Sequence, residues 1–340
     1  MTRCMTLPNR IVSASPHIRG GESTPTIMWS VVLSLVPVVA SAIYFFGPSA
    51  VLVLAASTAG AMAPESLLGG RGVRSLRDGS AAITGLLLGL TLPPGFPLWM
   101  AFLGGAFGIG FGKLVFGGLG QNVFNPALLG RAFLQAAFPV AITTWSRPAE
   151  SWWNLRGDNL ALPLMSPSVP DAMSGATPLG LMKFEQTTTP SWELILGTTS
   201  GSLGETSGLI ILLCGLFLAA RKHLDWRIPA SILGSVALAC TLLHGFDSAH
   251  YPSPLFMLFS GGLMLGAIFM ATDMVTSPVT HKGCWIFGVG IGLLVVVIRI
   301  WGGLSEGVMY AILLMNAFVP FINRATQPRT FGALEKERAS

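Results

Sequence analysis

The stretch that decides the fold is residues 285–301, which read WIFGVGIGLLVVVIRIW and contain one charged residue, Arg299. It is one of ten apolar stretches, which lie at about 26–46, 48–64, 79–93, 98–116, 122–142, 207–220, 229–243, 254–272, 285–301 and 307–323. Several are interrupted by Gly or Pro and are shorter than the roughly 20 residues of a straight span, which is typical of broken or tilted helices lining a site. The pattern predicts an all-α polytopic membrane protein with about ten transmembrane helices.

The composition supports this class and excludes others. Hydrophobic residues make up 51% of the 340 residues and charged residues only 10%, against roughly 25% charged in soluble domains. The 4 Cys are scattered without a C-x-x-C pair, so neither a disulfide scaffold nor iron–sulfur or other metal ligation is expected. The net charge of +5 comes from short basic clusters between apolar stretches, which favours membrane orientation over nucleic-acid binding.

The distribution of Lys and Arg predicts the orientation. Most of the 20 basic residues fall in alternate connections and in the two tails, and these segments are cytoplasmic by the positive-inside rule. Residues 1–25 and 324–340 are then cytoplasmic tails. The net acidic segment 143–206, which contains Arg147, Arg156 and Lys183, is then periplasmic.

An internal repeat divides the chain into two five-helix units, 26–142 and 207–323. Three pairs of segments recur in the same order: GLLLG at 85–89 and GLMLG at 262–266, FGIGFG at 107–112 and FGVGIG at 287–292, and LLGRAF at 128–133 and LLMNAF at 313–318. Because five is an odd number, the second unit would enter the membrane upside down, giving two inverted repeats with a site where they meet. Coincidence in a Gly- and Leu-rich chain is the alternative.

The long segment 143–206 contains the most distinctive motif, Asp171-Ala-Met-Ser174-Gly175-Ala176-Thr177. Small residues surround the Thr177 hydroxyl, and such a run leaves a weak alcohol nucleophile accessible to a modifying enzyme. Taken alone, Ser-Gly-Ala-Thr is more often an ordinary turn.

The pattern Asp-x-x-Ser-Gly-Ala-Thr resembles the flavinylation motif of bacterial respiratory complexes, in which a flavin transferase esterifies the final Thr with the phosphate of FMN. The resemblance is to the family formed by the D subunit of the Rnf complex and the B subunit of the sodium-pumping NADH:quinone reductase, which carry the motif between the fifth and sixth spans. Further resemblances lie at residues 15–17, 122–127 and 271–278, and the short N-terminal tail favours the Rnf branch.

This resemblance implies an electron-transfer subunit of a redox-driven ion translocase in the bacterial inner membrane, belonging to enzyme class 7. Such a complex couples ferredoxin and NAD chemistry to Na⁺ or H⁺ translocation. It implies FMN on Thr177, with Asp171, Ser174, Gly175 and Ala176 as the recognition motif. It further implies a flavin-bearing G-type subunit and cytoplasmic iron–sulfur and NAD subunits as partners.

A second, non-covalent flavin, riboflavin, is expected among the helices on the same resemblance. Asn122 and Asn125 match the corresponding element, and amides suit a uracil-like ring edge because they both donate and accept. Helix capping is the alternative for both residues. Arg131, one turn further along, is expected to face a cavity or a partner, where it could stabilise an anionic flavin or pair with a carboxylate.

Asp78 and Asp273 are the candidates for ion coupling. We expect them at the cytoplasmic ends of the third and eighth spans, in related positions of the repeat, while Glu65 and Glu306 lie at span edges and no carboxylate lies at a span centre. Helix capping is the alternative for Asp78. Arg299 is expected to snorkel to the membrane interface.

Three other classes compete with this interpretation. A b-type haem protein needs His pairs deep in facing helices, whereas all 5 His lie in tails or loops. A secondary transporter or channel with inverted repeats is the main alternative, and a structural subunit without cofactor is the third. The Asp171–Thr177 motif argues against both of these.

Overall fold

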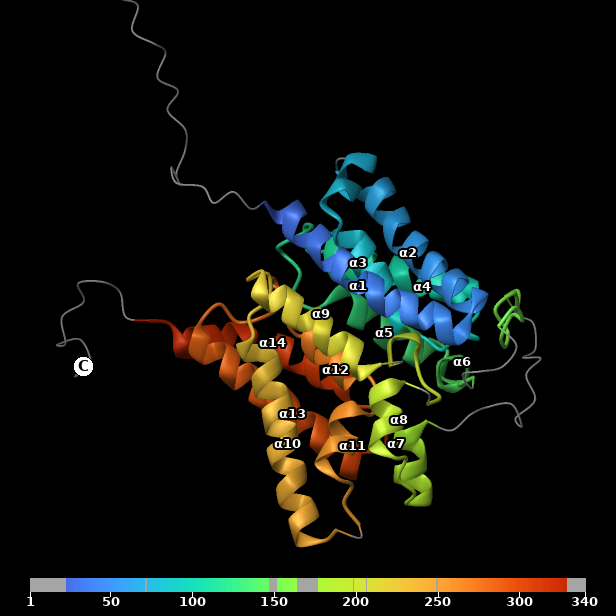
Figure 1. Ribbon diagram of the computed structural model, residues 1–340. Helices are drawn as coiled ribbons and strands as arrows, with labels where there is room; N and C mark the ends of the chain where they lie inside the picture. The colour runs from blue at the N-terminus through green and yellow to red at the C-terminus, as the bar shows by residue number, and fades with distance from the viewer. Residues whose placement is uncertain are drawn as a thin grey trace, which may run out of the picture.

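The computed structural model describes residues 23–70, 72–146, 152–163, 177–197, 199–205, 207–248 and 250–328, and all regular elements in these ranges are helices. The all-α prediction is therefore confirmed for the described residues (Figure 1). Five helices are long and apolar enough to cross a membrane: α1 (Thr24–Phe46), α2 (Pro48–Leu68), α10 (Arg227–Phe246), α13 (His281–Trp301) and α14 (Val308–Thr326). Shorter apolar helices cover Ser80–Leu90, Leu98–Leu114 and Gly208–Ala220.

The first group of helices contains α1 and α2, which are joined by a sharp turn at Gly47. This residue has φ +66°, and a Cβ there would collide with the Trp152 carbonyl, so the turn requires glycine. The group continues through a 3₁₀ helix and a series of shorter helices. These are η1 (Gly72–Asp78), α3 (Ser80–Leu90), α4 (Leu98–Ile109) with its π-helical extension η2 (Gly110–Leu114), α5 (Pro126–Ala137) and α6 (Pro139–Thr143).

A connecting segment leads to the second group. It holds short turns of helix: α7 (Pro178–Gly180), η4 (Leu181–Glu185), α8 (Ser191–Leu196) and η5 (Leu203–Glu205). The second group consists of α9 (Gly208–Ala220), α10, α11 (Pro254–Phe259), α12 (Leu263–Leu265), η6 (Gly266–Met270), α13 and α14.

The two groups pack internally in the same pairwise order. Helix α2 contacts α3 and α4, and α4 contacts α5; likewise α10 contacts α11 and α13, and α13 contacts α14. Between the groups, α1 lies beside α9 and α5 touches α14 (Figure 1). Matching contacts of this kind are expected of an internal repeat. The inverted topology and the bounds of the repeats remain predictions.

Small residues allow the closest helix contacts in both groups. Gly60 and Gly105 lie where α2 meets α4, and a Cβ on either would collide with backbone of the facing helix. On α13, a Cβ at Gly288 would collide with the Ser231 hydroxyl of α10. Close approach through glycine and serine is a common way for membrane helices to pack, since lipid removes most of the hydrophobic drive between them.

The stretch predicted over 254–272 is broken in its middle. Helix α11 ends at Phe259, and the chain resumes helical geometry only at Leu263. Gly261 has φ +65°, a left-handed value that a continuing helix cannot contain. In the first group, α3 similarly ends at Leu90, eight residues before α4 begins at Leu98. Each break leaves helix-terminal carbonyls that need donors.

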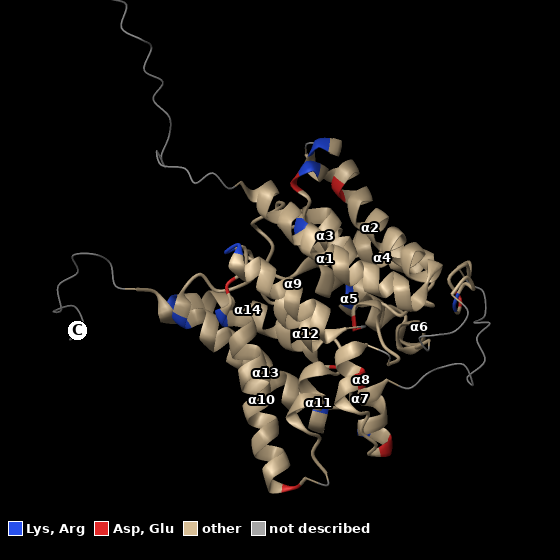
Figure 2. Cartoon of the chain, in the orientation of Figure 1, with Lys and Arg blue, Asp and Glu red and all other residues tan. Residues whose placement is uncertain are grey.

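Charged residues collect at particular ends of the helices (Figure 2). Basic residues mark the connection between α2 and α3 and the ends of α9 and α14, whereas acidic residues mark the far ends of α10 and η4. Blue and red segments also lie inside the bundle near α5, α11 and α12. The interior charges are the unexpected feature, because such groups are expensive to bury unless they are paired.

Candidate functional site

A cavity lies between the two groups of helices. Its empty volume, counted together with the solvent at its open mouth, is about 780 Å³, and residues of α1, α3, η2, α5, α9 and η6 line it. Two of the three π-helical segments in the described residues, η2 and η6, contribute to it, and such segments often accompany functional sites. Three of the predicted site residues, Asn122, Asn125 and Asp273, line this one cavity although they are far apart in the sequence.

Asn125 joins the two groups at the base of the cavity. Its Oδ1 accepts from the backbone N–H groups of Ala127 (3.0 Å) and Leu128 (3.4 Å), which caps α5. Its Nδ2 donates to the carbonyl of Met270 at 3.0 Å, at the end of η6. The capping role is therefore present, and the same amide also fixes the position of η6 relative to α5.

Asn122 and Asp273 present polar groups to the cavity. Asn122 is 6% exposed, and its Oδ1 accepts no hydrogen bond from the described residues. Asp273, in the turn after η6, accepts from the Val275 N–H at 3.3 Å and the Thr276 hydroxyl at 3.2 Å. Burial raises the pKa of the Asp273 carboxyl, against the effect of these hydrogen bonds. A buried acceptor without a donor is a place where a ligand N–H can be satisfied.

Lys113 adds a buried positive charge to the same cavity. Its side chain is 3% exposed, and Nζ lies 2.9 Å from Glu65 Oε2 and 2.7 Å from the Ser80 hydroxyl. Asp78 Oδ2 lies 3.9 Å from the same nitrogen, and Asp78 Oδ1 accepts from the backbone N–H of Ser80. Sequence reasoning misses this role, because the positive-inside rule treats Lys113 only as an orienting charge. The apolar run around it, FGKLVF at 111–116, is a signal that could have indicated burial.

Asp78 and Asp273 do not hold equivalent positions in the two groups. Asp78 precedes α3, whereas Asp273 follows η6. Both accept from the backbone N–H two residues further on, from Ser80 and Val275 respectively. The two residues therefore form the same kind of local turn, but at opposite ends of their helical segments. Only Asp273 lines the cavity.

Arg131 lies away from the cavity lining. Its side chain is 7% exposed, and Nη1 donates to the Thr91 carbonyl at 2.9 Å, at the end of α3. The guanidinium thus caps the carbonyl end of a short helix, where a positive charge is favourable.

Thr177, the last residue of the predicted Asp171–Thr177 motif, begins a described part of the chain. It is half-buried and caps α7, with Oγ1 accepting from the Gly180 N–H at 3.1 Å. The other motif residues, Asp171, Ser174, Gly175 and Ala176, lie outside the described residues.

Lys183 anchors the segment that follows Thr177. Its Nζ donates to several carbonyls at the end of α13, including those of Arg299 (3.1 Å) and Leu304 (2.7 Å). Desolvation lowers the pKa of the Lys183 ammonium. Thr177 is thereby held near the C-terminal end of α13, whereas the cavity is lined by the turn that precedes this helix. A helix of this length spans about 30 Å, so the two sites lie toward opposite ends of the bundle.

The expectation that Arg299 snorkels to the interface is wrong. Arg299 is 1% exposed, and its guanidinium donates to the carbonyls of Met257 (2.8 Å) and Ser260 (3.0 Å) and to Glu306 Oε1 (3.2 Å). The free carbonyls at the broken end of α11 make the inward orientation favourable. An Arg inside an apolar stretch is itself a signal of such a role.

Glu205 and Glu306 meet near the same break. Glu306 Oε1 accepts from the Gly262 N–H at 3.1 Å, and Glu205 interacts electrostatically with Glu306 and Arg131. We refer to Arg131, Glu205, Arg299 and Glu306 as the central charge cluster. Sequence reasoning missed it because Glu205 belongs to the long polar segment, whose re-entry into the bundle has no local signal.

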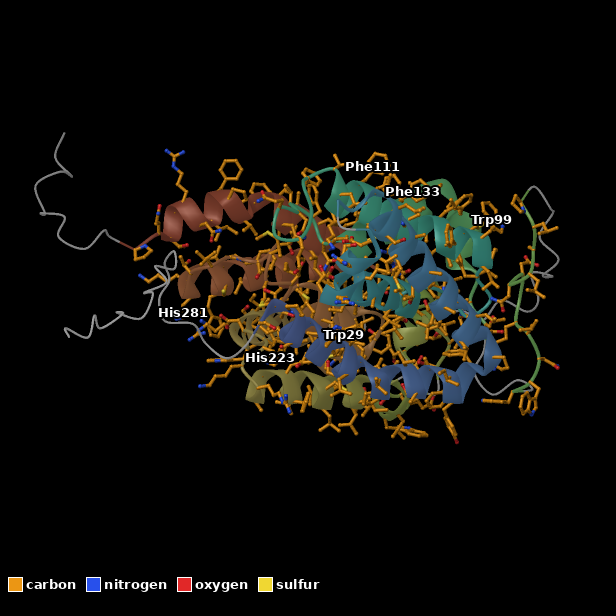
Figure 3. All side chains as sticks on the ribbon, turned by 90° about the horizontal axis from the view of Figure 1, so that it is seen from above. Trp29, Trp99, Phe111, Phe133, His223 and His281 are labelled. Carbon is orange, nitrogen blue, oxygen red and sulfur yellow. The ribbon has the colours of Figure 1, made fainter. Side chains whose placement is uncertain are left out.

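Figure 3 shows the surroundings of the cavity from above, with His223, a lining residue, close to Trp29 of α1 in that view. Phe111 and Phe133 lie near one edge, and the Phe107 ring stacks on both, with centroids 4.6 and 4.1 Å away. This stack fixes α4 and η2 against α5. Of the elements that the stack joins, η2 and α5 also contribute residues to the cavity.

Comparison with known proteins identifies the family. Residues 11–332 match the NQR2, RnfD, RnfE family. The chain belongs to this family. The match covers both groups of helices and the segment between them.

Relatives in this family are similar over nearly the whole chain. The D subunit of the ion-translocating oxidoreductase complex of Stutzerimonas stutzeri is 44% identical over 332 residues, covering 92% of this chain and 93% of that protein. The D subunit of the proton-translocating ferredoxin:NAD(+) oxidoreductase complex of Clostridium ljungdahlii is 41% identical, covering 94% and 96%. The D subunit of the Na(+)-translocating ferredoxin:NAD(+) oxidoreductase complex of Acetobacterium woodii is 40% identical, covering 95% and 96%.

Proposed function

We propose that this chain is the D-type membrane subunit of an Rnf-type ion-translocating ferredoxin:NAD oxidoreductase, and that it carries electrons through FMN esterified to Thr177. The observation that carries the proposal is the Asp171–Thr177 motif, ending at a threonine near the C-terminal end of α13. Family membership supports the role of a membrane subunit of an ion-translocating oxidoreductase, and the names of the relatives indicate the type of complex.

The geometry at Thr177 suits a tethering role. A hydroxyl has one proton and two lone pairs, and Gly180 N–H occupies only one lone pair of Oγ1. When a flavin transferase presents FMN as a phosphoanhydride, the remaining lone pair would attack the flavin-bearing phosphorus, the anhydride bond to the leaving nucleotide would break, and the hydroxyl proton would pass to a base of the transferase. The ester attaches the flavin through its phosphate, so the redox chemistry of the ring stays that of the cofactor.

The cavity is the proposed site of a second, non-covalent flavin, riboflavin. Asn122 Oδ1 offers an acceptor without a donor among the described residues, Asn125 offers a fixed amide, and Lys113 offers a buried ammonium donor that is ion-paired with Glu65. When bound, a flavin would supply a second electron carrier, and these residues would orient its polar edge. Arg131 is not among them, because it caps α3.

The proposed setting is the bacterial inner membrane, with both termini cytoplasmic and the Thr177 segment periplasmic. Proposed partners are a flavin-bearing G-type subunit, cytoplasmic iron–sulfur and NAD subunits, and the flavin transferase. Asp273, with its raised pKa in the cavity, and Asp78, beside Lys113, are the proposed ion-coupling residues. The relatives named for protons and for sodium are 41% and 40% identical to this chain, so overall similarity favours neither cation.

In-gel fluorescence of the denatured chain, expressed with and without a flavin transferase, tests the proposal. We expect transferase-dependent fluorescence that disappears in Thr177→Ala and persists in Thr177→Ser, because serine keeps both the nucleophile and the cap. Thr188→Ala, an exposed threonine in the same segment, is the matched control and should fluoresce normally. A dark wild-type band in the presence of active transferase would favour the transporter alternative.

A further inference from the structure

The central charge cluster sits where the broken helix α11–α12 meets the re-entering segment at η5. Its members come from four places: Arg131 from α5, Glu205 from η5, Arg299 from α13 and Glu306 from the turn before α14. Gly262 marks the meeting point, because the Oε1 atoms of Glu205 and Glu306 each lie 3.6 Å from the position of a Cβ on this glycine. The two carboxylates therefore approach the same point of the break.

Three of the four members have strong, fixed partners. Arg299 donates to two carbonyls of the break, and Arg131 donates to the Thr91 carbonyl of the other break. Glu306 accepts from the Gly262 N–H with both oxygens, at 3.1 and 3.2 Å, and from Arg299. Helix-terminal carbonyls and N–H groups satisfy these charges, so they are structural.

Glu205 lacks such partners. Its Oε1 is buried and accepts no hydrogen bond from the described residues, and its Oε2 accepts a long contact of 3.4 Å from the Ser202 N–H. Ser260, two residues before Gly262, is 0% exposed, and its hydroxyl also has no partner within the described ranges. An ionised carboxylate held this way, next to a second carboxylate, has lost hydration that Ser202 and Arg131 replace only in part.

We propose that Glu205 holds one exchangeable monovalent cation, a proton or Na⁺, against the fixed carboxylate of Glu306. Both cations remove the same uncompensated charge: a proton by neutralising Oε1, and Na⁺ by binding between carboxylate and hydroxyl oxygens. The charged groups that face Glu205 are Glu306 and Arg131, with Arg299 behind Glu306. Arg131 lowers the affinity for a cation and Glu306 raises it, which favours binding that is reversible.

The site connects to the segment that carries Thr177. Leu179, two residues after Thr177, is 3% exposed, and its side chain lies 2.6 Å from the position of a Cβ on Gly261. Cation uptake at Glu205 would thus respond to charge arriving on a flavin at Thr177. This transport role rests on the function proposed above, whereas cation binding by Glu205 does not.

Infrared difference spectroscopy of the purified full chain in lipid tests the inference directly. Spectra recorded during a pH titration without Na⁺ should contain the C=O band of a buried protonated carboxyl that disappears in Glu205→Gln. Glu205→Asp, which keeps a carboxyl in a shifted position, should move the band. Glu185→Gln removes an exposed carboxylate of the same connecting segment and should leave the band unchanged.

Addition of Na⁺ distinguishes the two cations. Loss of the Glu205 band at constant pH identifies Na⁺ as a competing occupant, and an unchanged band identifies a proton site. A wild-type chain with neither a Glu205-dependent band nor a Glu205-dependent response to Na⁺ would overturn the inference. Covalent-flavin fluorescence measured on the same samples reports the Thr177 proposal separately, so the two can fail independently.

Discussion

At the residue scale, the informative groups are polar side chains that bind helix ends within the bundle. Arg299 satisfies two carbonyls at the broken end of α11 and pairs with Glu306, although it lies in an otherwise apolar stretch. Asn125 performs a similar task between α5 and η6. Each such group makes a break in the backbone compatible with burial, because the exposed carbonyls and N–H groups find partners.

Replacing Arg299 with leucine should destabilise the protein strongly. The change leaves Glu306 without its cation and two carbonyls without a donor, and removal of one partner from a buried ion pair costs about 3–5 kcal/mol. Thermal unfolding of the detergent-solubilised chain measures the loss. Arg324→Leu, at an exposed position of α14, should unfold close to wild type, and equal stability of both variants would contradict the assigned role.

Asn122→Ala should reduce the content of non-covalent flavin while covalent flavin at Thr177 is retained. The substitution removes the unpartnered acceptor from the cavity, and a lost hydrogen bond of this kind is worth about 1 kcal/mol, or roughly fivefold in affinity. Flavin released on denaturation, compared with fluorescence that remains on the chain, measures the two populations. Equal release from wild type and variant would remove Asn122 from the proposed second site.

At the element scale, glycines and serines determine how closely the helices approach. On α13, Gly288 faces Ser231 and Gly292 faces Ser235, both on α10. The same principle operates where Gly105 of α4 meets α2. Interhelical distance is therefore controlled by residues whose own hydropathy says little about packing.

Gly288→Ala should destabilise the contact between α10 and α13. The added methyl would collide with the Ser231 hydroxyl, and overpacking of this kind costs about 1–3 kcal/mol. Gly234→Ala on α10 is the matched control, because no atom lies within 4 Å of its Cβ position and alanine favours helix by up to about 1 kcal/mol. Thermal unfolding should rank Gly234→Ala at or above wild type and Gly288→Ala below it; the reverse order would refute the packing argument.

At the scale of the whole molecule, two sites lie toward opposite ends of one bundle. The cavity gathers α1, α3, α5, α9 and η6, while Thr177 and Lys183 lie near the turn between α13 and α14. The central charge cluster lies at the helix breaks, in contact with the Thr177 segment through Leu179. The proposed electron transfer across a membrane would need two cofactor positions separated in this way.

Cysteine labelling tests the proposed orientation in the membrane. In a chain without its native cysteines, Val73→Cys in η1 and Glu185→Cys in η4 place exposed thiols near the two ends of the bundle. An impermeant reagent added to intact cells should label the residue-185 thiol, and the residue-73 thiol should react only after permeabilisation. Labelling of both positions from the same side would contradict the predicted topology.

The amino-acid sequence by itself determined the class of the protein and predicts Thr177 as the residue to be modified. Long apolar stretches establish a helical membrane protein, because backbone groups in lipid must be satisfied within each segment. The Asp171–Thr177 motif is contiguous, so its chemistry can be read without knowing any distance. Asn122, Asn125 and Asp273 were identified as candidates by type and resemblance, although their meeting in one cavity depends on the packing of the two groups.

Only the tertiary structure decided which charges are buried and what they contact. Lys113 and Glu65, 48 residues apart, form an ion pair at the cavity, and Arg299 turns inward although a snorkelling position was expected. Glu205 belongs to a polar segment by sequence but ends beside the broken helix. The physical reason is that each helix break leaves backbone N–H and C=O groups without a partner in the helix. Side chains distant in the sequence bond to these groups, and only folding brings them within hydrogen-bonding distance.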